Sequence, residues 1–262
     1  MFFDTHTHLD DEQMRDVRGE LLRELPAAGI APVMAIAADR ESCKTALKLS
    51  EHNSYILAAV GYHPAAAQNM DEELFAELAT LAEHPRVKCI GEIGLDYHWP
   101  EETDKEKQKY WFIRQMELAK KLKKPVSIHS RDAMADTLEI LKMFPEVKGV
   151  MHCYAGSYQT MMELVKMGYY IALGGVVTFK NAKTAVEVAQ FVPSERLLIE
   201  TDCPYLAPEP HRGELNTPMY IPLIAEKIAE IRGTSTEEIA KLTRDNAMKL
   251  FGITHKGEDR YE

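Results

Sequence analysis

Two histidines stand one residue apart at the end of the first apolar run of the chain. They are His6 and His8, in the sequence FFDTHTH of residues 2–8. Successive side chains of a strand point to opposite faces, so both imidazoles lie on one face. Because imidazole is a common metal ligand, the pair predicts half of a metal site at a strand end. The alternative is a surface pair in a loop.

Four more polar side chains each follow a later apolar run, where a strand is predicted to end. They are Glu92, His129, His152 and Asp202. Taken alone, each of them could simply cap a helix or stabilise a loop. Together they would meet at one mouth of a parallel barrel, where desolvating them is costly unless they pair or bind metal. With the first two histidines they can hold two divalent ions, Glu92 bridging the ions and Asp202 accepting a proton from water.

Short apolar runs that read as strands alternate with amphipathic helical segments. The predicted strands are 2–8, 31–37, 55–61, 87–93, 125–129, 148–153, 169–174 and 197–202. Nearly continuous apolar runs are typical of strands buried on both faces of a parallel sheet. Eight of them in a chain of this length predict an α/β fold, a (β/α)8 TIM barrel. The rival, an open doubly wound sheet, usually has a glycine-rich phosphate loop where this chain has histidines.

Helices are expected between these strands and after the last one. The clearest segments are 71–78, 105–123, 157–167 and 181–191, followed by two extra C-terminal helices at about 218–231 and 235–251. Ser235 and Glu238 have the spacing of a capping box, with Ser235 as the N-cap. The sequence shows no internal repeat and no long linker, so it predicts a single domain over 1–262.

Composition limits the classes of protein to consider. With 45% hydrophobic residues the chain can form a full core, yet it has no run of roughly 18 apolar residues and no signal-peptide pattern. The four cysteines are widely separated, which favours a cytoplasmic protein. The formal charge of −10 argues against a broad basic surface for duplex DNA. It does not exclude a phosphate substrate, since metal ions supply positive charge locally.

Several motifs in order along the chain resemble those of the TatD family of metal-dependent deoxyribonucleases, which are amidohydrolase-type barrels. They cover residues 2–10, 61–64, 91–97, 125–131, 152–156, 200–208 and 212–218. The main departure is Cys203, where family members usually have Ala or Ser. The resemblance implies that the six residues above are metal ligands. It also implies hydrolysis of phosphodiester bonds in nucleic acid, probably single-stranded DNA from a 3′ end, with two ions of Zn, Mg or Mn.

Other residues near the predicted mouth are candidates for substrate contact. His63 could hold a phosphate oxygen or donate a proton, or it could anchor its loop. Arg131 and Arg212 could bind phosphate with their forked guanidinium groups. Tyr154 and Tyr205 could stack on bases or pack in the wall.

Other polar residues near these motifs receive simpler interpretations. Asp4 is expected to orient His6 or His8. The histidines at 52, 84 and 255 are expected in solvent, and His98 and Trp99 are expected to pack in a loop.

Two alternatives to a nuclease remain open. One is an amidohydrolase-type enzyme acting on an amide, a lactone, a phosphotriester or an aminoacyl ester. The other is a binding or scaffold role, which would predict loss of some ligands, although none of the six is missing. The expected partner is a nucleic-acid substrate and no membrane. The oligomeric state is open, with a monomer plausible.

Overall fold

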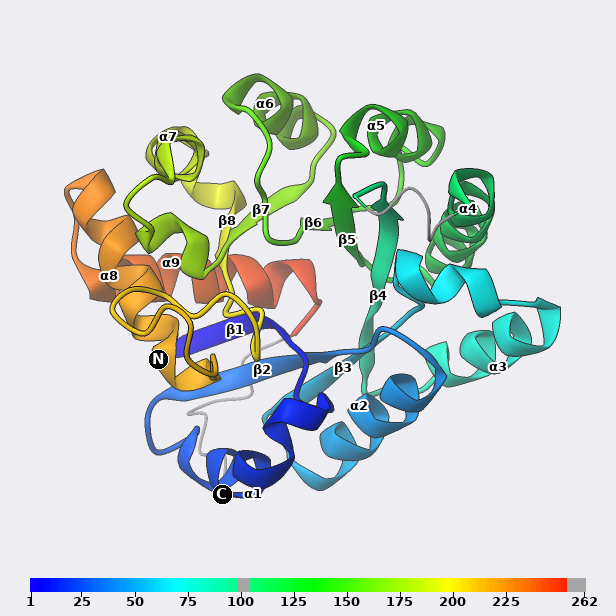
Figure 1. Ribbon diagram of the computed structural model, residues 1–262, viewed down its shortest axis with the longest axis horizontal. Coiled ribbons are helices and arrows are strands. Elements are labelled where there is room, and N and C mark those ends of the chain that lie inside the picture. The colour runs from blue at the N-terminus through cyan, green and yellow to red at the C-terminus, as the bar shows by residue number, and fades with distance from the viewer. Residues whose placement is uncertain (99–103, 254–262) are drawn as a thin grey trace.

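The computed structural model describes residues 1–98 and 104–253. Its eight strands form one parallel sheet in the order β1 to β8, and helices surround the sheet (Figure 1). This arrangement confirms the predicted (β/α)8 barrel. The strands are β1 (Phe2–Thr7), β2 (Ile30–Ile36), β3 (Ile56–Val60), β4 (Val87–Asp96), β5 (Val126–Arg131), β6 (Gly149–Met151), β7 (Tyr170–Leu173) and β8 (Leu197–Ile199).

The last and first strands meet through a short contact beyond the end of β8. Thr7 and Cys203 form a parallel bridge. The backbone N–H of Asp202 donates to the carbonyl of His6 over 3.0 Å, and that of His8 donates to Cys203 over 2.8 Å. The contact that nearly closes the barrel therefore also places Asp202 beside the two N-terminal histidines.

Nine α-helices are assigned in the described part of the chain. They are α1 (Arg15–Glu24), α2 (Arg40–His52), α3 (Glu72–Ala82), α4 (Lys105–Leu122), α5 (Met134–Met143), α6 (Tyr158–Lys166), α7 (Lys183–Phe191), α8 (Ile221–Arg232) and α9 (Thr236–Leu250). The predicted capping box of Ser235 and Glu238 is present at the start of α9. Within residues 1–98 and 104–253, no helix combines the length and the hydropathy needed to cross a membrane.

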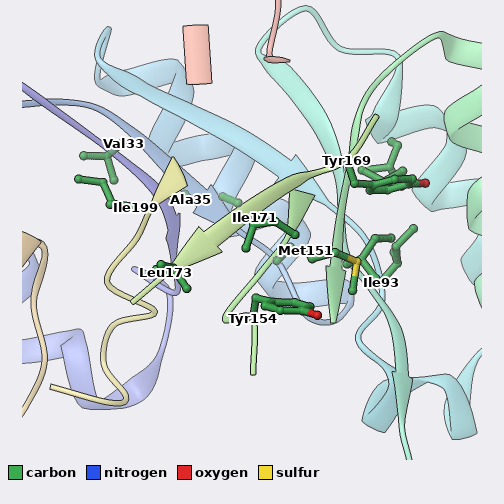
Figure 2. Packing of buried hydrophobic residues seen from close by; sticks show 14 of the residues in the cluster. Val33, Ala35, Ile93, Met151, Tyr154, Tyr169, Ile171, Leu173 and Ile199 are labelled. Carbon is green, nitrogen blue, oxygen red and sulfur yellow. The ribbon is translucent and has the colours of Figure 1, made fainter. Parts of the chain in front are cut away.

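The larger apolar layer lies between the sheet and the surrounding helices. It joins buried strand residues to buried residues of the outer helices, such as Leu21 of α1, Trp111 of α4 and Ile224 of α8. Figure 2 shows part of it, with Met151 and Ile171 extending from β6 and β7. Because both faces of each strand are covered, the strands read as continuous apolar runs in the sequence.

A second apolar cluster fills the barrel interior, and α9 covers it. It contains strand residues such as Phe3, Met34 and Leu198 together with Met248 of α9 and Phe251, the residue that follows this helix. The Phe3 and Phe251 rings lie 5.8 Å apart between centroids, and α9 passes behind β1 and β8 in Figure 1. The final helix therefore closes the end of the barrel at which the strands begin.

Irregular ladders in β1 and β4 change which side chains face the barrel mouth. The β1–β2 register shifts between Asp4 and Thr7, and the β4–β5 register shifts between Ile90 and Ile93. β4 also continues to Asp96, so Glu92 lies within the strand rather than at its predicted end. A strict two-residue alternation therefore does not hold near the site.

Candidate metal centre

The structure brings all six predicted ligands to one mouth of the barrel. His6 belongs to β1 and His129 to β5, while His152 directly follows β6. Asp202 lies three residues beyond β8, with a backbone φ of 57°. Because β6 and β8 end earlier than the sequence predicts, their ligands lie in the loops rather than in the strands.

Four side chains form a compact donor cluster at the β1–β8 side of the mouth. The Nε2 atoms of His6 and His8 are 3.2 Å apart. They lie 3.5 and 3.4 Å from Glu92 Oε2, and 3.8 and 3.7 Å from Asp202 Oδ1. Two ligands bound tetrahedrally at about 2.1 Å from one ion would be about 3.4 Å apart. The two nitrogens and two oxygens are therefore spaced as ligands of a single cation.

A second cluster surrounds the other oxygen of Glu92. Glu92 Oε1 lies 2.8 Å from Nδ1 of His129, 3.3 Å from Nε2 of His152 and 3.8 Å from Nε2 of His63. Glu92, His129 and His152 can together present three donor atoms to one ion. The two carboxylate oxygens of Glu92 thus face different imidazole sets, and nitrogen and oxygen donors of this kind suit Zn²⁺ or Mn²⁺.

Each of the four histidines proposed as ligands has its other ring nitrogen beside a protein oxygen atom. His6 Nδ1 is 3.3 Å from Ser127 Oγ, and His8 Nδ1 is 3.2 Å from the backbone carbonyl of residue 36. His152 Nδ1 is 3.0 Å from Glu200 Oε1, and His129 Nε2 is 3.1 Å from Asp96 Oδ2. Such contacts fix the ring orientation and the tautomer, as they do in metal sites.

The sequence analysis did not identify Asp96, Ser127 and Glu200 as parts of the site. Glu200 is fully buried, and it accepts hydrogen bonds from His152 and from the backbone N–H of Cys153. Asp96 and Glu200 could have been predicted, because each is an acidic residue close to a proposed ligand at a strand end. Ser127 gave no such signal, since it precedes His129 within an apolar strand.

The charges of the cluster shift its pKa values strongly. Burial alone would raise the pKa of Glu92, but the imidazoles of His152 and His63 and the hydrogen bond to His129 hold it well below its usual range. Burial lowers the pKa of His8, yet the carboxylates of Glu92 and Asp202 raise it to about 9. Glu200, Glu92 and Asp202 likewise raise the pKa of His152 against the effect of burial. Without metal, protons therefore supply the positive charge that the carboxylates require.

Asp4 does not orient the histidine rings, contrary to expectation. Its carboxylate accepts hydrogen bonds from the backbone N–H and the hydroxyl of Thr201, at 2.9 and 2.6 Å. Burial raises the pKa of Asp4 to about 8. The shifted register of β1 directs the side chain toward the segment after β8, so Asp4 ties that segment to β1 instead.

The mouth above the cluster is a cavity of about 510 Å³, and two of the predicted substrate residues line it. These are His63 and the exposed Arg131. Tyr205 also lines it, and its hydroxyl donates to Asp11. Asp10 and Asp39 add to the acidic part of the wall.

Two other predicted substrate residues lie elsewhere. Tyr154 is only 4% exposed and its hydroxyl donates to the carbonyl of Ser157 over 2.8 Å, so it packs in the wall of a separate, smaller cavity instead of lining the mouth. Arg212 lies with its guanidinium 4.3 Å from the centroid of the Phe179 ring, and it does not line the mouth. The loop after β8 carries it over the neighbouring loop after β7.

The histidines expected in solvent or in a loop lie away from the cluster where the structure describes them. His52 is exposed and His84 is partly exposed on the helical surface. His98 Nδ1 is 2.8 Å from Asp132 Oδ2, which fits the expected loop role. Trp99 and His255 lie outside the described residues.

The chain matches one protein family over nearly all its length. Residues 3–252 match the family described as TatD related DNase. The chain is 44% identical to the uncharacterized metal-dependent hydrolase YabD of Bacillus subtilis, covering 97% of this chain and 100% of that protein. It is 33% identical to the 3′-5′ ssDNA/RNA exonuclease TatD of Citrobacter rodentium, covering 97% and 99%.

Solved structures show the same fold. The crystal structure of YjjV, a TatD homologue from Escherichia coli K12, has a TM-score of 0.89 at 29% identity, covering 97% of this chain and 98% of that one. A TatD-family hydrolase from Entamoeba histolytica has a TM-score of 0.85 at 23% identity, with the same coverage. The similarity therefore extends over the whole barrel rather than over single motifs.

Proposed function

This chain belongs to the TatD-related DNase family, and from that membership we propose that it hydrolyses phosphodiester bonds in single-stranded DNA, removing nucleotides from a 3′ end. The relative from Citrobacter rodentium supports the substrate, since its name describes a 3′-5′ exonuclease on single strands. The single observation that carries the proposal is the placement of the two Glu92 oxygens, each facing its own set of imidazoles.

The donor clusters indicate which residues would hold two divalent ions. His6, His8, Glu92 and Asp202 would hold one, and Glu92, His129 and His152 would hold the other. When bound, two such ions neutralise phosphoryl charge and lower the pKa of a water molecule. Glu92 fixes the two sets relative to each other because it belongs to both.

In this proposal Asp202 accepts the proton from the attacking water. Its carboxylate lies at the mouth with 12% of the side chain exposed, beside His6 and His8. The backbone hydrogen bond from Asp202 to the carbonyl of His6 holds it there. A carboxylate at the edge of the cluster can reach both a ligand position and an incoming water.

His63 acts as a hydrogen-bond donor rather than as a ligand in this proposal. Its Nδ1 accepts from the backbone N–H of Ala65 over 3.1 Å. A neutral imidazole that accepts at one nitrogen carries its hydrogen on the other. The Nε2–H of His63 therefore points to the mouth, where it can donate to a phosphate oxygen. Arg131 supplies the positive charge on the same wall.

A second candidate is hydrolysis of an amide, lactone or aminoacyl ester. The acidic lining of the mouth favours it, because Asp10, Asp11, Glu12 and Asp39 surround the entrance while Arg131 is the cationic lining residue there. A substrate with little negative charge would meet less repulsion than a polynucleotide. The nuclease is preferred because of the named activity of the relative.

The decisive experiment is a nuclease assay on labelled single strands. Metal-free protein is reconstituted with Zn²⁺, Mn²⁺ or Mg²⁺ in turn, and lactone and cyclic-amide substrates are tested in parallel. We expect stepwise shortening from the 3′ end with at least one ion. Cleavage of only the uncharged substrates would favour the second candidate, and undiminished DNA hydrolysis in excess chelator would overturn the metal centre.

Substitution tests the residue roles in the same assay. Glu92→Ala and Asp202→Asn are each expected to lower turnover by at least about 10³-fold, because both act within one cooperating unit. Glu187→Ala, on an exposed position of α7, is the control and should leave turnover unchanged. Near-normal turnover of either site variant would remove that residue from the mechanism.

A further inference from the structure

A smaller cavity lies beside the metal centre, between the loops that follow β6 and β7. It encloses about 180 Å³, and its lining begins at Cys153, the residue directly after His152. The loop after β7 and the first residues of α7 form its other walls. Neighbouring residues of the chain, His152 and Cys153, therefore line the mouth and this cavity, at the same end of the barrel.

The lining of this cavity combines apolar walls with a polar edge. Leu173 and Val177 are buried and form apolar walls, whereas Asn181, Lys183 and Thr184 are exposed. Its volume is well below the roughly 300–1,000 Å³ of pockets that enclose drug-sized ligands. A flat heterocycle with polar atoms on its rim suits this space better than a whole nucleotide.

Charge distinguishes this side of the mouth from the opposite side. The loops after β1 and β2 contribute Asp10, Asp11 and Asp39. The loop after β7 and the first residue of α7 instead contribute Lys180 and Lys183, for which no ion pair is found in the described part of the chain. Arg212 lies over Phe179 on this same segment. A polyanionic strand that leaves the metal centre is repelled by the first side and attracted by the second.

We propose that this cavity binds the base of one nucleotide flanking the scissile phosphate, while Lys183 contacts the neighbouring backbone phosphate. The inference rests on the proposed nuclease function and specifies how that site holds its substrate. Binding through ring faces tolerates any sequence, because every base has an apolar face. It also provides a role for the cationic segment after β7 that the metal centre does not use.

The test compares a single-stranded oligonucleotide with bis(2,2,2-trifluoroethyl) phosphate, a small diester that has no flat ring to enter the cavity. Ala182→Trp fills the cavity, and Lys183→Glu reverses the charge at its edge. Lys121→Glu makes the same charge change at an exposed position of α4 and serves as the matched control. Metal content and circular dichroism are recorded for each variant.

Both site variants should raise KM for the oligonucleotide by about tenfold. Turnover of the small diester should stay within about twofold of the wild type, and Lys183→Glu should also weaken the salt dependence of oligonucleotide binding. Lys121→Glu should change neither substrate.

Two results would overturn the cavity assignment while leaving the nuclease intact. One is an unchanged oligonucleotide KM in both site variants, and the other is an equal loss on both substrates. Failure of the wild-type protein to cleave the oligonucleotide with any ion would instead overturn the proposed function itself.

Discussion

At the scale of single residues, the site depends on carboxylates that contact the histidine rings on two sides. Glu92 lies in front of the rings, between the two donor clusters. Glu200 and Asp96 lie behind His152 and His129 and accept from the nitrogens that face away from Glu92. The rings are thereby held in place before any ion binds, which lowers the cost of ordering the site.

Glu200 offers a direct test of this support. Glu200→Gln keeps the shape of the side chain but removes the charge that faces His152, so we expect metal affinity to fall about 10- to 100-fold. Affinity is measured by competition with a chromophoric chelator. Gln190→Glu, a charge change at an exposed position of α7, is the comparison. Equal affinities for Glu200→Gln and the wild type would show that the hydrogen-bond geometry alone is sufficient.

Metal affinity should rise with pH. The neighbouring carboxylates raise the pKa of His8 from 6.5 to about 9 in the metal-free protein, so below that pH an ion must displace a proton from the ring. Metal affinity therefore increases as the pH rises from about 6.5 to 9, by up to about tenfold per pH unit for each proton released. Calorimetry in buffers of different ionisation enthalpy measures the release. A flat profile between pH 6.5 and 8.5 would contradict it.

At the scale of elements, α9 serves the barrel rather than the site. It begins at a capping box and ends at Leu250, and the ring of the next residue, Phe251, packs near Phe3. The ligands lie at the opposite ends of the strands, where the chain runs into the loops. Stability and chemistry are therefore carried by opposite ends of the same strands, as is general for this architecture.

Truncation of Phe251 should separate these two roles. Phe251 is 4% exposed, so Phe251→Ala is expected to lower the free energy of unfolding by about 3–5 kcal/mol. Phe191→Ala, at the end of α7, is the control because Phe191 is 52% exposed and should cost far less. Denaturant unfolding gives both values. If Phe251→Ala also lost bound metal while it remained folded, the separation would be incorrect.

At the scale of the whole molecule, the site joins the first strand of the barrel to the segment that follows the last strand. His6 and His8 come from β1 and Asp202 comes from the segment after β8, where the sheet is closed by a single bridge and two neighbouring backbone hydrogen bonds. Ions bound between them would add contacts across this seam. The apolar layers on both sides of the sheet do not involve the ligands, so we expect the fold to persist without metal.

Removal of the metal should therefore lower the thermal stability of the protein without unfolding it. We expect the metal-free protein to keep its far-ultraviolet circular dichroism and to melt at a lower temperature. Added ion should stabilise it by about 2.7 kcal/mol at a free concentration one hundred times Kd. Thermal melts over a series of ion concentrations measure the shift. Unfolding of the metal-free protein at room temperature would show that the metal is needed for folding.

The sequence by itself determined the barrel and the six proposed ligands. The strands are buried on both faces, so their apolar runs stand out, and each ligand interrupts or follows such a run. His6, His8, Glu92, His129, His152 and Asp202 could therefore be selected from residue type and position alone.

Only the tertiary structure decided how these residues are supported and which others reach the mouth. The register shifts in β1 and β4 redirect Asp4 and place Glu92 inside its strand, and such irregularities break the two-residue alternation on which the prediction relied. Tyr154 and Arg212 carry suitable chemistry, but packing directs them into the core and onto Phe179. Residue type shows which chemistry is available, whereas the direction of a side chain depends on neighbours that are distant in the sequence.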